Sequence, residues 1–135
     1  MATIKKNIAA AAVLHETADY GGSAAVLAAD GAYDYTSDVD LETLGQEGTH
    51  VLVEFHGNNA QDDFIVDVFG SLDATTYDTE PIPQYHRTVK NKGKWQAISL
   101  IVKDLLHFRI GVKGFSTNTI FQYQITHQAW NLSNA

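Results

Sequence analysis

The sequence contains no cysteine and no long hydrophobic run, and these absences exclude several classes of protein. Without cysteine, the chain cannot form disulfides, a thiolate nucleophile or a cysteine-based zinc site. No apolar run approaches the ~20 residues of a membrane-spanning helix. Lys5 and Lys6 precede a short Ala-rich run, as in a signal peptide, but the run is brief and acidic residues follow, so we expect no signal sequence. The 135 residues suit one compact domain with an apolar core.

Common motifs of catalysis and nucleotide binding are also missing. The sequence has no GxGxxG, P-loop, HExxH or GxSxG motif. None of the six histidines stands two or four residues from another, so we expect scattered imidazoles and not a shared metal site. We therefore predict no catalytic residue, no metal ligand and no cofactor, and a protein that is not an enzyme. A site assembled from distant strands is the alternative that spacing alone leaves open.

Basic residues are scarce in the first part of the chain. The net charge is −7, but residues 1–80 carry two lysines against fifteen acids, a net −13, whereas residues 81–135 carry seven basic residues against one acid, a net +6. A two-signed surface suits docking of like copies or of a charged partner, unless folding mixes the charges again. The acidic total argues against a nucleic-acid-binding protein, which needs a basic surface.

One acidic segment invites a metal-binding interpretation. Asp34, Asp38, Asp40 and Glu42 fall within nine residues. Carboxylates at such spacing can ligate calcium, but the glycine of an EF-hand loop is missing. A solvated acidic loop is the interpretation that we favour.

From residue 48 onward, apolar and polar residues alternate with the period of a β-strand. The connecting segments are turn-like, and no amphipathic helix is convincing. This pattern predicts an all-β fold, an antiparallel two-sheet β-sandwich or jelly roll. The five predicted strands span residues 50–56, 63–72, 95–102, 106–113 and 119–127.

The same pattern predicts how these strands are connected and placed. Gly, Asn and Asp in residues 57–63 predict a hairpin between the first two strands. Residues 95–102 are apolar on both faces and predict a central strand. Pro81 and Pro83 flank a stretch that is an edge strand or a loop. The tail, residues 129–135, is polar apart from Trp130 and Leu132, and we expect it to pack as a short flap.

Residues 1–45 differ in composition from the rest of the chain. They are rich in Ala, Gly, Asp, Ser and Thr and poor in large apolar side chains. Two adjacent glycines interrupt any helix. We expect an extended Ala/Gly-rich N-terminal segment with short strands near residues 3–8 and 24–29. This segment belongs to the same domain as the β-sandwich core, residues 46–135.

Lysines and tryptophan come together in one basic stretch. Lys90, Lys92 and Lys94 surround Gly93, and Trp95 follows. The lysines could contact phosphates while the indole stacks on a base. We favour a turn with solvated lysines and a core tryptophan. A third interpretation is that the lysines face an acidic patch on a neighbouring subunit.

The aromatic side chains favour two interpretations. Tyr33 and Tyr35 alternate, so they share one face of any strand there. Together with other tyrosines, Trp95 and Trp130 they could form a platform on which a sugar ring stacks. The alternative is a place in the rim of the core or in an interface.

Two segments, residues 64–82 and 95–114, resemble a pattern in small β-sandwich proteins encoded among tailed-phage structural genes. In that pattern a strand ends in a Ser-Leu-Asp…Tyr-Asp turn, and a later Phe-Arg-Ile-x-Val strand follows. The pattern usually has Gly after the Asp, where this chain has Ala74, and Ala tolerates positive φ poorly. The resemblance is shared with galactose-binding-like sandwiches. The matching residues are Ser71, Leu72, Asp73, Tyr77 and Asp78 in the turn, and Phe108, Arg109, Ile110 and Val112 in the strand.

The resemblance implies a virion structural protein, such as a capsid cement or decoration protein that bridges major capsid subunits and is assembled in the host cytoplasm. The implied partners are the major capsid protein and copies of this chain, in a trimer or dimer, without nucleic acid or membrane. A tail or neck component and a carbohydrate- or receptor-binding domain are the alternatives. The contact residues that we predict are Lys5, Lys6, Tyr20, Tyr33, Tyr35, Lys90, Lys92 and Lys94.

Overall fold

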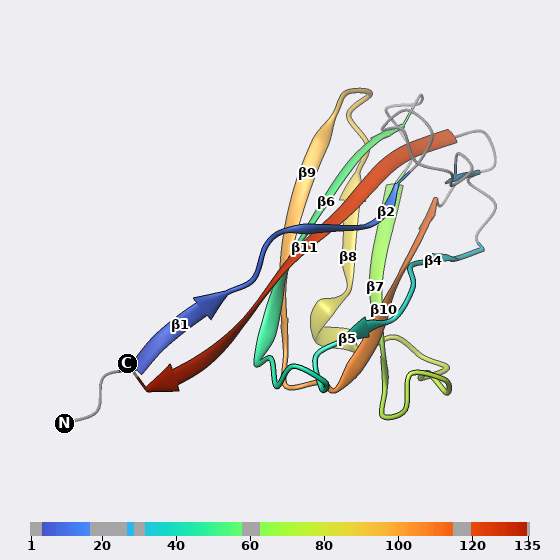
Figure 1. The fold of residues 1–135 in the computed structure, drawn as a ribbon. Helices are drawn as coiled ribbons and strands as arrows, with labels where there is room; N and C mark the ends of the chain where they lie inside the picture. The colour runs from blue at the N-terminus through green and yellow to red at the C-terminus, as the bar shows by residue number, and fades with distance from the viewer. Residues whose placement is uncertain (1–3, 17–26, 29–31, 58–62, 115–119, 135) are drawn as a thin grey trace.

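The chain folds into two antiparallel β-sheets that pack face to face (Figure 1). The computed structural model describes residues 4–16, 27–28, 32–57, 63–114 and 120–134, and every structural statement below refers to these residues. The predicted all-β sandwich is therefore confirmed.

The six-stranded sheet is built around the long strand β11 (Ile120–Asn134). One side of β11 pairs with β6 (Gly48–Gly57), which in turn pairs with β9 (Gln96–Lys103). The other side of β11 pairs in succession with three short strands. These are β3 (Leu27–Ala28), β2 (Ala12–Glu16) and β1 (Ile4–Ile8).

The five-stranded sheet is built around β10 (His107–Gly114). One side of β10 pairs with β7 (Asp63–Ser71), and β7 pairs with β8 (Arg87–Lys90). The other side pairs with two short strands from the N-terminal segment. These are β4 (Asp34–Tyr35) and β5 (Val39–Asp40), and the 3-10 helix η2 (Pro83–Tyr85) lies between β7 and β8 in the chain.

The core lies between the two sheets. Because successive side chains of a strand point to opposite faces, every second side chain of each long strand faces the other sheet, and these are mostly apolar. Phe55 of β6 and Phe64 of β7 stack there with ring centroids 4.4 Å apart. The fully buried side chains include Val51, Val53, Phe55, Phe64, Val66, Val68, Leu100, Val102, Phe108, Ile110, Val112, Tyr123 and Ile125.

The predicted hairpin at residues 57–63 is wrong. β6 and β7 belong to different sheets, so the segment between them crosses from one sheet to the other. Residues 58–62 lie outside the described residues, and a turn-like composition does not say which strands pair. Here β6 finds its partners in β11 and β9, far along the chain.

The prediction of a central strand at residues 95–102 is also wrong. β9 is an edge strand, paired with β6 alone among the described strands. Its outward side chains are exposed, Ile101 to 51%. Trp95, predicted in the core, is 47% exposed and lies beside His56, with ring centroids 5.4 Å apart. In this strand, apolar residues on both faces do not mean that both faces are buried, because one of them is exposed.

The predicted C-terminal flap is in fact the end of β11. The strand continues to Asn134 because β1, more than a hundred residues away in sequence, supplies its hydrogen-bonding partner. The predicted strands near residues 3–8 and 24–29 are present as β1 and β3, and Pro83 begins the 3-10 helix of a loop. Leu106, the first residue of the strand predicted at 106–113, precedes β10 and is 44% exposed.

Candidate functional site

A two-stranded ribbon projects from one corner of the sandwich, at the lower left of Figure 1. β11 pairs with β6 only as far as Trp130, which lies opposite Gly48. Beyond that point, residues 131–134 pair with β1 alone. We call β1 together with residues 130–134 the ribbon. In the part of the chain that the structure describes, no other strand pairs with β1.

The ribbon has an apolar face that is open to solvent. Directly opposite residues of an antiparallel pair share a face, as do residues two apart along a strand. The register therefore places Lys6, Ile8, Trp130 and Leu132 on one face. Ile8 is 61% and Leu132 51% exposed, and the Lys6 ammonium lies 4.3 Å from the Trp130 ring centroid. The opposite face carries amide side chains such as that of Asn7.

Gly48 makes room for the tryptophan at the start of the ribbon. A Cβ at Gly48 would stand 2.8 Å from Cζ2 of Trp130 and 2.9 Å from Cβ of Lys103. These distances are shorter than van der Waals contact, so only glycine lets the indole lie over β6 at this point.

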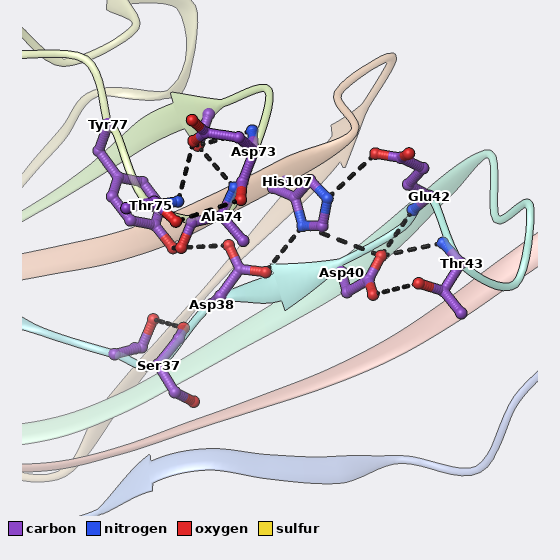
Figure 2. Close-up of polar contacts among 12 residues, drawn as sticks. Ser37, Asp38, Asp40, Glu42, Thr43, Asp73, Ala74, Thr75, Tyr77 and His107 are labelled. Carbon is purple, nitrogen blue, oxygen red and sulfur yellow. Dashed lines mark hydrogen bonds and ion pairs between the residues drawn. The ribbon is translucent and has the colours of Figure 1, made fainter.

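A histidine surrounded by carboxylates lies at the start of β10 (Figure 2). Nδ1 of His107 is 2.8 Å from Oδ2 of Asp38, and Nε2 is 3.1 Å from Oε2 of Glu42. Asp40 lies 3.9 Å from Nδ1. The hydrogen bond to Asp38, supported by its charge and by Glu42, holds the pKa of His107 above its ordinary value although the ring is partly desolvated.

The carboxylates of this cluster also organise the backbone around them. Asp40 accepts hydrogen bonds from the backbone N–H groups of Glu42 and Thr43 and from the Thr43 hydroxyl, which lowers the pKa of Asp40. The Tyr77 hydroxyl donates to Asp38 at 2.7 Å. Burial and this bond raise the pKa of Tyr77 to about 12. The cluster therefore ties the N-terminal segment to the loop that follows β7.

The four carboxylates of the acidic segment, considered above as calcium ligands, do not converge. Asp34 lies apart from the other three and accepts a hydrogen bond from the Tyr123 hydroxyl, whereas Asp38, Asp40 and Glu42 surround His107. Among the described residues, no group of three or more His, Asp or Glu side chains is arranged to hold a metal ion.

An aromatic group covers the outer face of the five-stranded sheet. The rings of Tyr33 and Tyr35 lie 5.7 Å apart, as their predicted common face requires, and both meet the Phe69 ring edge-on at 5.2 and 5.5 Å. Gly111 makes room for them, because a Cβ there would lie 2.9 Å from Phe69 and Tyr33. Lys113 lies over Tyr33, with its Nζ 4.4 Å from the ring centroid.

Arg109 is held between two of these rings. Its guanidinium carbon lies 3.8 Å from the Tyr35 centroid and 4.4 Å from the Tyr77 centroid. Nε is buried without a hydrogen-bond partner among the described residues. Cation–π contact is thus what holds this arginine in place. It also means that the faces of Tyr33 and Tyr35 are already in contact with cations, and the predicted sugar-stacking role stays a prediction.

A carboxylate–imidazole–hydroxyl chain lies further along the same face. Oδ1 of the buried Asp67 is 2.7 Å from Nδ1 of His86, and Nε2 is 2.9 Å from the Thr88 hydroxyl. The Tyr33 hydroxyl donates to the other Asp67 oxygen at 2.6 Å. Such a chain activates a hydroxyl nucleophile in some hydrolases, where it also needs donors aimed at the developing oxyanion. Here it accounts for the burial of Asp67, whose oxygens are both bonded.

A surface depression of 580 Å³ lies beside the His107 cluster, between the loops that follow β7 and β9. Tyr77 lines it together with the exposed Leu72 and Leu106. Three aspartates also line it: Asp73, Asp78 and Asp104. No histidine is among the described residues that line it. The depression and the His107 cluster are neighbours that do not combine into one titratable site.

The predicted contact residues occupy three separate places. Lys5 and Lys6 are on the ribbon, Tyr33 and Tyr35 are on the outer face of the five-stranded sheet, and the three lysines of residues 90–94 are at the other end of the molecule. Lys90 ends β8, and the two following lysines are exposed in the turn before β9, as predicted. Tyr20 lies outside the described residues.

Sequence reasoning missed the cluster around His107. The acidic segment had been noticed, but its cation is an imidazole at least 65 residues further along the chain. The one local signal was that His107 stands on the polar face of an otherwise apolar strand, beside Arg109. Pairing of β5 with β10 is what brings the two parts together.

Comparison with known proteins adds no relative to this description. No protein-family model matches the chain, and no curated protein matches its sequence significantly. Within the described residues, no helix is long and apolar enough to cross a membrane.

Proposed function

We propose that this protein is a non-enzymatic structural component that attaches to a multi-subunit shell by laying the apolar face of its ribbon on a neighbouring subunit. The observation that carries the proposal is the exposure of Ile8 and Leu132 on a pair of strands whose outer strand, β1, pairs with no other described strand. A two-stranded ribbon is marginally stable by itself in water, so a partner surface that covers it adds stability as well as contact.

The ribbon suits contacts that are individually weak and numerous. Its apolar face contains two half-exposed aliphatic side chains and one tryptophan, a small area compared with the ~800 Å² that each partner buries in a stable interface. Many copies on a lattice compensate for modest single-site affinity through avidity. This is how a decoration protein works on a capsid.

The resemblance of the Ser71–Asp78 turn and the Phe108–Val112 strand to tailed-phage sandwich proteins supports a capsid as that shell. The protein would then be a cement or decoration protein that bridges major capsid subunits. A tail or neck location would use the ribbon in the same way on a different neighbour.

Binding to capsids tests the proposal directly. The wild-type chain and two variants, Ile8→Asp and Leu132→Asp, are sedimented with particles assembled from the major capsid protein of the same phage genome. A charge in the apolar face makes its burial unfavourable, so each variant should reduce the apparent affinity by about tenfold or more. Mass spectrometry of purified virions should find the wild-type chain.

The matched control is Asn7→Asp, which adds the same charge to the opposite face of the same strand. It should bind like the wild type. If both faces respond alike, or if neither aspartate in the apolar face weakens binding, the ribbon is not the attachment element.

A further inference from the structure

The free edge of β9 lies at the end of the six-stranded sheet opposite the ribbon (Figure 1). β9 pairs with β6 in continuous register from Gln96 to Lys103, and among the described strands none pairs with its other side. An edge strand presents a row of N–H and C=O groups that another strand can join.

The contacts of Tyr85 show which residues face this free edge. Its hydroxyl accepts a hydrogen bond from the backbone N–H of Lys103 and donates to the C=O of the same residue, both at 3.3 Å. Along an antiparallel strand, every second residue points its N–H and C=O groups away from the neighbouring strand, here β6. Ala97, Ser99 and Ile101 therefore direct their N–H and C=O groups to the free edge, as Lys103 does.

This edge lacks the features with which proteins usually block strand addition. Residues 96–102 contain no charged residue and no proline, and the register with β6 shows no bulge. Tyr85 covers the edge at Lys103 only. No described residue hydrogen-bonds to the free-edge groups of the three residues before it.

We propose that two copies of this chain associate through β9, antiparallel, about a two-fold axis at Ser99. Only this register uses all three free residues of both copies: Ser99 pairs with itself, and Ala97 pairs with Ile101 of the second copy. A shift by one residue pair in one direction places Ala97 opposite the edge position that Tyr85 already occupies. A shift in the other direction leaves Ile101 opposite a residue that lies before the strand.

The side chains on the outer face are complementary in the same register. The exposed Ile101 of each copy lies opposite Ala97 of the other, which gives two apolar cross-strand pairs. A second copy thus fits this edge without placing like charges opposite each other.

This pairing goes beyond the attachment proposed above and does not depend on it. The ribbon and the β9 edge are at opposite ends of the sheet, so a dimer leaves both ribbons free. A continuous sheet across the two-fold axis is the kind of isologous contact that closes after two copies.

Ser99→Cys tests the axis, since the chain has no other cysteine. Two residues that form a hydrogen-bonded antiparallel pair have Cα atoms ~5.5 Å apart, within the range that a disulfide spans. Mild oxidation of the variant should give a covalent dimer on a non-reducing gel. The matched control is Ala97→Cys, whose two thiols would be on the order of 14 Å apart and should crosslink about tenfold more slowly.

Sedimentation of the otherwise unmodified chain supplies the second measurement. The wild type should be a dimer whose dissociation constant rises about tenfold or more in Ile101→Lys, which places a charge on the edge. Ile8→Asp should leave the dimer intact, which separates this inference from the attachment proposal. A monomeric wild type, or equal crosslinking of both cysteine variants, would overturn the two-fold pairing. Circular dichroism checks that each variant folds.

Discussion

Ala74 shows how a single residue can carry backbone strain. Its φ is +62°, in the left-handed region that glycine adopts without cost and alanine does not. The turn around it is fixed by Asp73, which accepts hydrogen bonds from the N–H groups of Thr75 and Thr76. The strain at Ala74 is therefore imposed by neighbours that hold the turn closed.

Replacing Ala74 with glycine should relieve this strain. We expect Ala74→Gly to raise the free energy of unfolding by about 0.5–1 kcal/mol in urea denaturation. The control is Ala97→Gly, in the extended strand β9, where added chain entropy should lower the free energy of unfolding by a similar amount. If both variants change the free energy of unfolding in the same direction, the turn does not need a residue in the left-handed conformation.

The pKa values of His107 and His127 should be shifted in opposite directions from that of a free imidazole. His107 donates to carboxylates when protonated, so its folded-state pKa is raised above 6.5, whereas burial lowers the pKa of His127. The contribution of His107 to stability is complete below pH 6.5 and is lost as pH rises through its folded pKa. That of His127 is complete above pH 6.5 and is lost as pH falls through its lowered pKa.

NMR titration of the ring protons measures both values in one experiment. We expect the midpoint of His107 above that of His127, and His107→Gln should remove the loss of stability on the alkaline side. If the order of the two midpoints is reversed, the carboxylates do not control the His107 ring.

At the scale of elements, the outer face of the five-stranded sheet depends on close packing over one residue of β10. Tyr33, Tyr35 and Phe69 all approach Gly111, the nearest to within 2.9 Å of where a Cβ would stand. The same rings hold Arg109 and Lys113 by cation–π contact. A change at one position on this strand therefore propagates to the short strand β4 and to two cations.

Gly111→Ala should displace these rings. We expect a loss of about 1–3 kcal/mol in the free energy of unfolding and a weaker near-UV circular dichroism signal from the tyrosines. The control is Gly70→Ala on β7, where a Cβ would meet no aromatic ring. Its nearest neighbour, at 3.2 Å, is the Asp78 oxygen that accepts a hydrogen bond from the Gly70 N–H, so we expect a smaller loss there. Equal losses in the two variants would show that the rings do not depend on Gly111.

Elements also show where alternation is a reliable guide. β6, β7, β10 and β11 were predicted from apolar and polar residues that alternate along the chain. The burial of β6 follows this alternation, whereas β7 is buried on both faces, because Tyr33 and Tyr35 pack on its outer side. β9 was misplaced because its exposed face is also apolar, and periodicity cannot distinguish an apolar face that is buried from one that awaits a partner. That ambiguity is what the proposed β9 pairing explains.

At the scale of the whole molecule, the two ends of the six-stranded sheet differ. One end extends into the ribbon and the other ends in the free edge of β9. The ribbon and the β9 edge therefore lie at opposite edges of the same sheet, and the sandwich core holds them at a fixed separation.

The candidate site was only partly accessible to sequence reasoning at this scale. Lys5 and Lys6 were predicted as contact residues, and their strand β1 forms half of the ribbon. The apolar partner positions Trp130 and Leu132 were assigned to a flap, since nothing near them in sequence shows that β1 extends their strand. The clusters of His107 and of Asp67 depend in the same way on residues that are distant along the chain.

The sequence by itself determined the class of fold, the positions of the long strands and the absence of thiol chemistry, because each depends on the local period of apolar residues or on composition. Tertiary structure alone decided which strands share a sheet, which strand is at the edge and which carboxylates meet an imidazole. These depend on pairing between segments far apart in the chain, where backbone hydrogen bonds are the same for every partner and only burial of the whole core selects among them.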